Sequence, residues 1–286
     1  MQPTAEKFRI QTSDIALIFL AATLVVLPIL FWGVPVGTGD FTHHIQIANA
    51  YFESIQNGVL IPDWVLRENH GYGAVTVRFY PPLFHCSLAA FKLIFGTWHF
   101  AFFATLTFWS FVGGLGVFVW MRDIQGSRGL ALASASLFSL APYHLNQLYN
   151  SSMLGEFVAV SILPFCFLFA RRICIGGRIP NVLGFAISLA LLILSNLPQT
   201  IIGILCIGLY VLFYLSRENV FRALTSLIVA GVLGLALSSF YWIRMVTEMS
   251  WISVSHSSGD PAYDYKNHFL LNGLGLDAQG AWHRTG

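Results

Sequence analysis

Long apolar runs separated by short polar connectors make up most of the chain up to residue 243. An α-helix needs about 20 apolar residues to cross a bilayer. Runs of suitable length lie at residues 15–33, 99–120, 153–172 and 223–243, and a shorter one lies at 129–144. This pattern predicts a bundle of membrane-spanning helices.

The apolar run at residues 182–215 is too long for a single span. Asn196 and Pro198 interrupt it. Because proline lacks the backbone N–H that a helix interior needs, we expect two helices joined by a tight turn at SNLPQ.

Residues 81–96 form a shorter apolar segment that begins with two prolines and carries His85 and Lys92. Lys and Arg prefer cytoplasmic loops. The basic connectors fall on one side of the membrane only if this segment does not cross; they hold Lys7, Arg9, Arg122, Arg128, Arg171, Arg172, Arg178, Arg217 and Arg222. We therefore expect a re-entrant or interfacial helix, with His85 and Lys92 at its polar positions. If the segment does cross, the later basic loops face outward.

The expected fold is an all-α, polytopic transmembrane bundle of about seven spans plus the re-entrant or interfacial helix, with a cytoplasmic N-terminus. Residues 1–243 form the transmembrane domain, which includes an outer loop at 34–82. Residues 244–286 are richer in Ser, His, Gly, Asp and Tyr and are expected to form a polar tail on the outer side.

Composition supports an integral membrane protein. Charged residues make up 10% of the chain, against about 25% in soluble domains, and the mean hydropathy is +0.69. The lipid bilayer is therefore the expected partner. The net charge of +2 gives no indication of a nucleic-acid partner. The four cysteines lie in apolar runs and do not suggest a disulfide framework.

The outer loop opens with GTGDFTHHIQIA, residues 37–48, which places a carboxylate and two imidazoles where the chain leaves the membrane. Apolar residues recur at helical spacing from Phe41 to Ile55, which predicts an amphipathic helix on the membrane surface. Asp40 is placed to cap this helix. His43 and His44 are adjacent and point about 100° apart on a helix, so at most one is expected to face a site.

Further along the loop, Arg67 and Arg78 have the chemistry to grip a phosphate or to snorkel to lipid headgroups. Tyr80 suits the membrane interface. Glu156 lies at the start of the 153–172 run. Ionisable groups within membrane segments are costly and often functional, although a group at the edge of a segment can be solvated.

The order of these features resembles the GT-C superfamily of integral-membrane glycosyltransferases. The chain has one span, a large outer loop opening on an acidic residue, a surface helix, then GVLIPDW and FYPPL. The resemblance is strongest to bacterial and archaeal membrane proteins catalogued as 6-pyruvoyl-tetrahydropterin synthase-related, and to the YfhO-like group. The pterin term does not describe their chemistry. The pattern of Pro142, Tyr143, Leu154, Gly155, Glu156 and Ala159 adds to it.

This resemblance implies a hexosyl- or pentosyltransferase of the cell envelope, multi-pass in a bacterial or archaeal plasma membrane. Its donor would be a sugar on a polyprenyl phosphate. Asp40 would be the catalytic base, with Glu156 as a second catalytic residue closing the site. His43, His44, Arg67, Arg78 and Tyr80 would bind substrate. Some GT-C enzymes use a divalent cation such as Mg or Mn; here Asp40 and His44 would hold it, but the sequence does not decide.

Two departures from the resemblance keep other functions open. GT-C enzymes often pair two acidic residues in the first loop, whereas this chain has Asp40 alone at the expected place. Family members are longer, so we expect an N-terminal fragment. The alternatives are a transporter or flippase of a lipid-linked or polar solute, for which the interrupted pair around Pro198 would suit, and a non-catalytic fragment.

Overall fold

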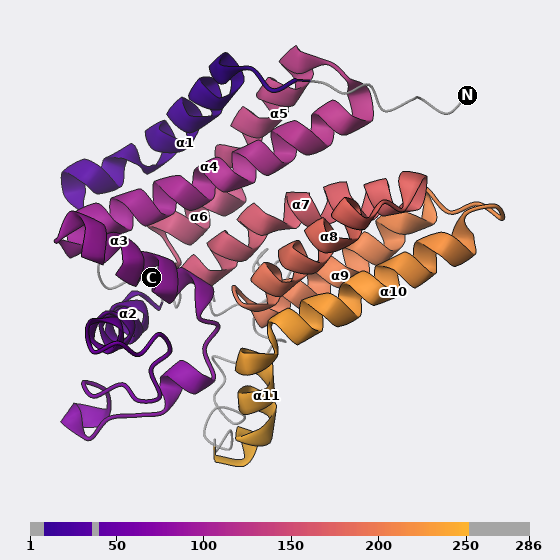
Figure 1. The fold of residues 1–286 in the computed structure, drawn as a ribbon. Coiled ribbons are helices and arrows are strands. Elements are labelled where there is room, and N and C mark those ends of the chain that lie inside the picture. Colours follow the sequence, from indigo (N-terminus) through magenta and orange to yellow (C-terminus); the bar gives the residue numbers. More distant parts are fainter. Residues whose placement is uncertain (1–8, 36–39, 252–286) are drawn as a thin grey trace, which may run out of the picture. The chain divides into compact units, whose positions relative to one another are not determined.

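The computed structural model describes residues 9–35 and 40–251 of the chain, and these residues form an all-α structure, as expected (Figure 1). The chain divides into two units, Met1–Ile243 and Arg244–Gly286. The helices are α1 (Thr12–Trp32), α2 (Phe41–Gln56), α3 (Leu83–Phe95), α4 (Trp98–Gln125), α5 (Arg128–Ser139), α6 (Pro142–Tyr149), α7 (Leu154–Gly176), α8 (Ile179–Ile193), α9 (Leu197–Leu212), α10 (Val220–Leu237) and α11 (Ser239–Thr247). Within the described residues, extended pairing is limited to one antiparallel bridge, Val65 with Ala74.

Four helices are long and apolar enough to cross a membrane: α1, α4, α7 and α10. They correspond to the four long runs of the sequence. The other predicted spans are shorter helices. For example, α8 has 15 residues and α9 has 16, so each is about 22–24 Å long at 1.5 Å per residue.

The predicted single helix at 129–144 is wrong, because the chain breaks between α5 and α6. Helix α5 ends at Ser139, and Pro142 is the first residue of α6. The residue before a proline is disfavoured in the α conformation, and Ala141 is accordingly extended, with ψ of 136°. Because the run is apolar on both sides of the break, its hydropathy alone does not reveal it.

The turn predicted at SNLPQ is confirmed. Helix α8 ends at Ile193 and α9 begins at Leu197, with Pro198 in its first turn. The Asn196 side chain caps α9 by accepting a hydrogen bond from the Gln199 backbone N–H at 2.9 Å.

Helices α1 and α4 run antiparallel, and their contacts show how α3 is placed. At one end, His99 on α4 lies 2.8 Å from the Leu30 carbonyl of α1. At the other end, Arg128, just after α4, pairs with Asp14 of α1 at 2.6 Å. The chain therefore leaves α1 and enters α4 at the same end of the bundle. This geometry supports the expectation that residues 81–96 do not cross.

Small residues let α4 approach α7 closely at the centre of the bundle. A Cβ on Gly113 would lie 3.1 Å from the Cα of Ser161, and one on Gly116 would lie 2.7 Å from the Phe165 ring. Larger residues on α4 would force the two helices apart, so the glycines set this helix–helix distance.

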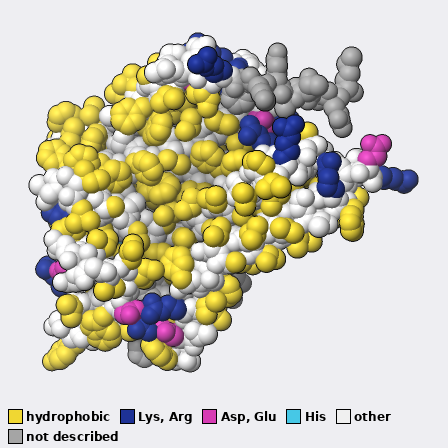
Figure 2. Space-filling model, viewed as in Figure 1, with side chains coloured by type: hydrophobic (Ala, Val, Ile, Leu, Met, Phe, Trp, Pro, Cys, Tyr) yellow, Lys and Arg dark blue, Asp and Glu magenta, His cyan; other side chains and the backbone are white. Residues whose placement is uncertain are grey.

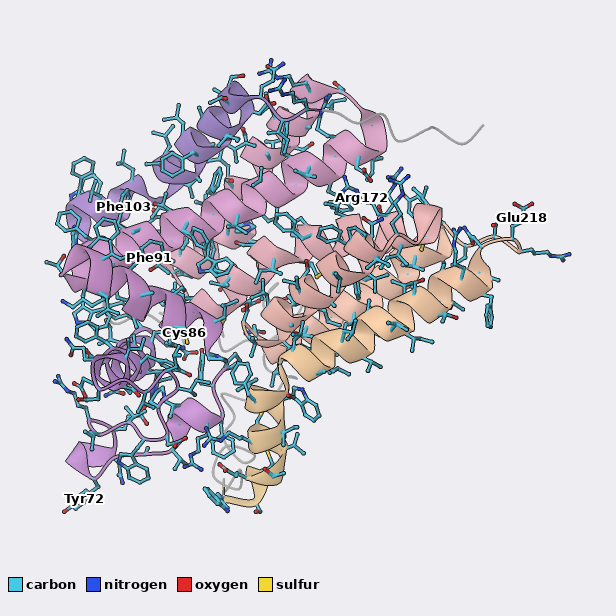
Figure 3. All side chains as sticks on the ribbon, in the orientation of Figure 1. Tyr72, Cys86, Phe91, Phe103, Arg172 and Glu218 are labelled. Atoms are coloured by element: carbon cyan, nitrogen blue, oxygen red, sulfur yellow. The ribbon has the colours of Figure 1, made fainter. Side chains whose placement is uncertain are left out.

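Arginines gather at the end of the bundle opposite to the loop between α2 and α3. Figure 3 labels Arg172 and Glu218 at this end and Tyr72 at the tip of the loop between α2 and α3, at the other end. Asp123 of α4 pairs there with Arg171 and, at 3.0 Å, with Arg172. The face drawn in Figure 2 is mostly hydrophobic between these ends. This sorting fits a membrane-embedded bundle, and the cytoplasmic side of the basic end stays a prediction.

Candidate functional site

The first turn of α2 separates the three polar residues singled out in the sequence. Asp40 is the residue before the helix, but its side chain makes no capping hydrogen bond. His43 is exposed, whereas His44 is fully buried. The prediction that the adjacent histidines face different directions is confirmed.

His44 joins three segments of the chain. Its Nδ1 lies 3.0 Å from Nε2 of His85 on α3, and its Nε2 accepts a hydrogen bond from the Leu154 backbone N–H at 3.4 Å. The expectation that His85 occupies a polar, solvated position is wrong, because its side chain is fully buried. His85 lies in the half of α3 that is buried, together with Phe84, Leu88 and Ala89, where α3 packs against α2, α4 and α7.

Burial keeps both imidazoles neutral. It lowers the pKa of His44 to about 4, against an opposing contact with the Ser152 carbonyl and with help from the His43 charge. Burial also lowers the pKa of His85 well below its ordinary value, and a proton on neighbouring His44 would lower it further. Removal from water disfavours the charged form of an imidazole.

Tyr80 packs against this histidine pair and is influenced by the charges of two acidic residues. Its ring makes edge contacts with His44 and His85, with centroids 5.5 and 5.2 Å away. Burial raises the pKa of the Tyr80 phenol, and the charges of Asp40 and Glu156 raise it further. The structure therefore places Asp40 and Glu156, which are far apart in the sequence, near enough to Tyr80 for both charges to act on it.

Glu156 sits in the first turn of α7 and accepts two hydrogen bonds. The donors are the Tyr143 hydroxyl of α6 and the Gln199 amide of α9, the latter at 2.5 Å. The Gln199 amide also donates to the Tyr143 hydroxyl at 2.7 Å. Glu156 is thus oriented by two neighbouring helices.

Tyr143 and Gln199 were not predicted as site residues. Their local signals were visible, since Tyr143 belongs to the Pro–Tyr pattern and Gln199 to the SNLPQ turn. What the sequence does not show is that α6 and α9 meet at Glu156.

Gly155 permits this convergence. A Cβ there would lie 2.9 Å from the Ser195 carbonyl oxygen and 3.9 Å from the Tyr80 ring. A backbone oxygen cannot rotate away as a side chain can. The glycine therefore lets α7 begin directly against the α8–α9 turn and Tyr80.

The two arginines expected to bind phosphate lie in ion pairs elsewhere on the loop. Arg67 pairs with Glu53 at 3.3 Å, near the far end of α2 from Asp40. Thirteen residues of helix separate Asp40 from Glu53, which is about 20 Å. Arg78 donates to the Asp63 carbonyl at 3.2 Å and lies 3.8 Å from the Asp63 carboxylate. The structure does not gather them with Asp40.

Asp40 and His44, the ligands that a Mg or Mn ion would have here, do not form a metal site in the described residues. Among the described residues there is no group of three or more His, Cys, Asp and Glu side chains that could hold a metal ion. Hard divalent cations prefer several oxygen ligands. Both ring nitrogens of His44 are already engaged by His85 and Leu154, so it is not free to join Asp40 around a cation.

Comparison with known proteins assigns a family. The model of the 6-pyruvoyl-tetrahydropterin synthase related domain, described as a membrane protein, matches residues 77–260. No curated protein matches the chain. The match covers more than half of the chain and includes Arg78, Tyr80 and Glu156, whereas Asp40, His43, His44 and Arg67 precede it. The chain belongs to this family of membrane proteins.

Proposed function

We propose that this member of the 6-pyruvoyl-tetrahydropterin synthase related membrane proteins is a glycosyltransferase. It would move a sugar from a polyprenyl-phosphate donor to an acceptor hydroxyl at the outer membrane face. The observation that carries the proposal is the meeting of Asp40, Tyr80 and Glu156 at the outer-loop end of the bundle. The phenol of Tyr80 lies close enough to both carboxylates for their charges to raise its pKa.

The transfer needs a base for the acceptor hydroxyl and a hydrogen-bond donor for the leaving phosphate. The acceptor oxygen attacks the anomeric carbon, and the bond to the phosphate oxygen breaks with its electron pair leaving on the polyprenyl phosphate. Asp40 is the base that takes the acceptor proton, because a carboxylate without a capping bond is available to another donor. Tyr80 keeps its proton, since its pKa is raised, and donates a hydrogen bond to the leaving phosphate.

Glu156 would orient the sugar rather than move a proton. Tyr143 and Gln199 both donate to it, so its carboxylate is held in one orientation. A fixed, charged carboxylate accepts hydrogen bonds from sugar hydroxyls and stabilises positive charge that develops at the anomeric carbon.

The test compares two carboxylates of the same outer segment. Asp40→Asn is expected to lower transfer from a panel of polyprenyl-phosphate sugars by about 100-fold or more, the usual effect of losing a general base. Glu53→Gln is the control, because Glu53 lies on the same helix α2 in an exposed pair with Arg67, and its transfer rate should stay within about twofold. Equal activity of Asp40→Asn and wild type would contradict the proposal.

A transporter is the second candidate, because Gln199, which follows the α8–α9 turn, donates a hydrogen bond to Glu156. Broken helices of this kind form substrate sites in transporters. Proteoliposomes separate the two functions. Absence of transfer with every donor, together with solute uptake that Glu156→Gln abolishes, would overturn the glycosyltransferase in favour of the transporter.

A further inference from the structure

We propose that His44 and His85 form a neutral, hydrogen-bonded imidazole pair that fixes the distance between the two carboxylate-bearing segments, the first turns of α2 and α7. Both are positioning residues for the site described above, so this inference rests on the proposed function for its catalytic consequence. Its structural part stands without that function.

The pair lies between the two segments. His44 is four residues after Asp40 on α2, and its partner Leu154 is two residues before Glu156 on α7. His85 adds α3 to the same point. Cys86, the neighbour of His85, marks this part of α3 beside α2 in Figure 3. A change at His44 is therefore transmitted to both carboxylates through few bonds.

Neutrality sets the hydrogen-bond roles within the pair. Each neutral imidazole carries one N–H and one bare nitrogen, so one histidine donates to the other across the 3.0 Å between Nδ1 of His44 and Nε2 of His85. On its other side, Nε2 of His44 faces the Leu154 N–H at 3.4 Å, and the His44 ring also contacts the Ser152 carbonyl. The His85 ring contacts the Pro81 carbonyl.

Aromatic rings surround the pair. Phe84 contacts both imidazoles edge-on, with centroids 5.2 and 5.3 Å away, and Tyr51 stacks on His85 at 6.2 Å. The titratable groups around the pair are Tyr80, Tyr51 and the exposed His43. Asp40 and Glu156 act on Tyr80 instead. A proton added to the pair would thus be buried without a carboxylate partner.

This arrangement gives the pair a pH dependence of known sign. The pKa of His44 is about 4 in the folded protein and 6.5 ordinarily, so the unfolded or separated state binds more protons between these values. The contribution of the pair is complete above pH 6.5 and falls as the pH drops toward 4. Carboxylate positioning is expected to weaken over the same window.

The first experiment measures the pair directly. Histidine labelled with ¹⁵N in bilayer-embedded protein should show a nitrogen–nitrogen coupling between two neutral imidazoles at pH 6 and 7. His85→Phe should abolish it, because phenylalanine keeps an aromatic ring but has no nitrogen to share the hydrogen bond. His99→Gln, an exposed position on α4, should leave it intact. No coupling, or titration of both imidazoles near pH 6.5, would overturn the pair.

The second experiment measures positioning. Spin labels at Thr42→Cys and Met153→Cys, both exposed, report the separation of the two segments when Cys86 and Cys206 are replaced by Ser. We expect one narrow distance distribution in the parent and a broader or shifted one with His85→Phe. His85→Gln, which restores an amide near the Nε2 position, should narrow it again. An unchanged distribution in His85→Phe would overturn the positioning role.

The catalytic consequence is read separately. His85→Phe is expected to lower kcat by about tenfold or more with a smaller change in KM, because a misplaced base slows chemistry more than binding. If the wild type transfers no sugar, the proposed function fails while the coupling and distance results still decide the pair. If the wild type transfers sugar and His85→Phe does so equally well, the positioning role fails.

Discussion

At the scale of single residues, Gly155 carries the tightest steric constraint beside the candidate site. Its own conformation is helical, so the constraint comes from the Ser195 carbonyl and not from backbone strain. The acid that follows it is useful only if α7 can begin at this point. The close approach of the α7 backbone to the Ser195 backbone therefore explains why residue 155 is a glycine.

Gly155→Ala is expected to destabilise the protein by about 1–2 kcal/mol. The clash with a backbone oxygen costs about 1–3 kcal/mol, and the better helix propensity of alanine offsets about 0.5–1 kcal/mol of it. Thermal unfolding in detergent should show a lower midpoint. Gly231→Ala on α10 is the matched control, because a Cβ there meets nothing within 4 Å. Its midpoint should be unchanged or higher, and equal behaviour of the two variants would contradict the clash.

At the scale of helices, the sequence predicts an element where a local signal marks it. Asn196 and Pro198 predict the turn between α8 and α9, and the long apolar runs predict α1, α4, α7 and α10. The break at Pro142 carried the same kind of signal, but the hydropathy of the surrounding run concealed it. No local signal in the sequence marks the burial of His85, because the packing of α3 against three other helices depends on distant residues.

The prediction at this scale concerns the ion pair that links α4 and α7. Asp123 and Arg171 are both largely buried, with side chains 7% and 10% exposed. Asp123→Asn should cost about 3–5 kcal/mol, because it leaves the Arg171 charge without its counterion. Denaturant titration of the helical signal measures this loss. The exposed Arg67–Glu53 pair provides the comparison, and Glu53→Gln should change stability by less than about 1 kcal/mol. A similar small loss in Asp123→Asn would show that Arg171 finds another partner.

At the scale of the whole described bundle, five separate segments build the candidate site. Asp40 comes from α2, Tyr80 from the connection to α3 and Glu156 from α7, with Tyr143 and Gln199 supplied by α6 and α9. The resemblance indicated Asp40 and Glu156 singly, and their meeting through Tyr80 appears only in the fold. Arg67 and Arg78 show the opposite case. They precede Tyr80 in the same loop, but they pair with Glu53 and Asp63 and not with the site.

The site can face an outer acceptor only if the bundle is inserted with its basic end in the cytoplasm. The antiparallel contact of α1 with α4 supports an α3 that does not cross, and the Lys and Arg distribution then sets the direction. In intact cells carrying Cys206→Ser, a membrane-impermeant thiol reagent should label Thr42→Cys. It should label Arg217→Cys, in the connector before α10, only after permeabilisation. If α3 did cross, α4 and every later segment would invert, and Arg217→Cys would be labelled from outside along with Thr42→Cys. Labelling of Arg217→Cys alone would reverse the whole bundle, and Asp40 and Glu156 would then act on a cytoplasmic substrate.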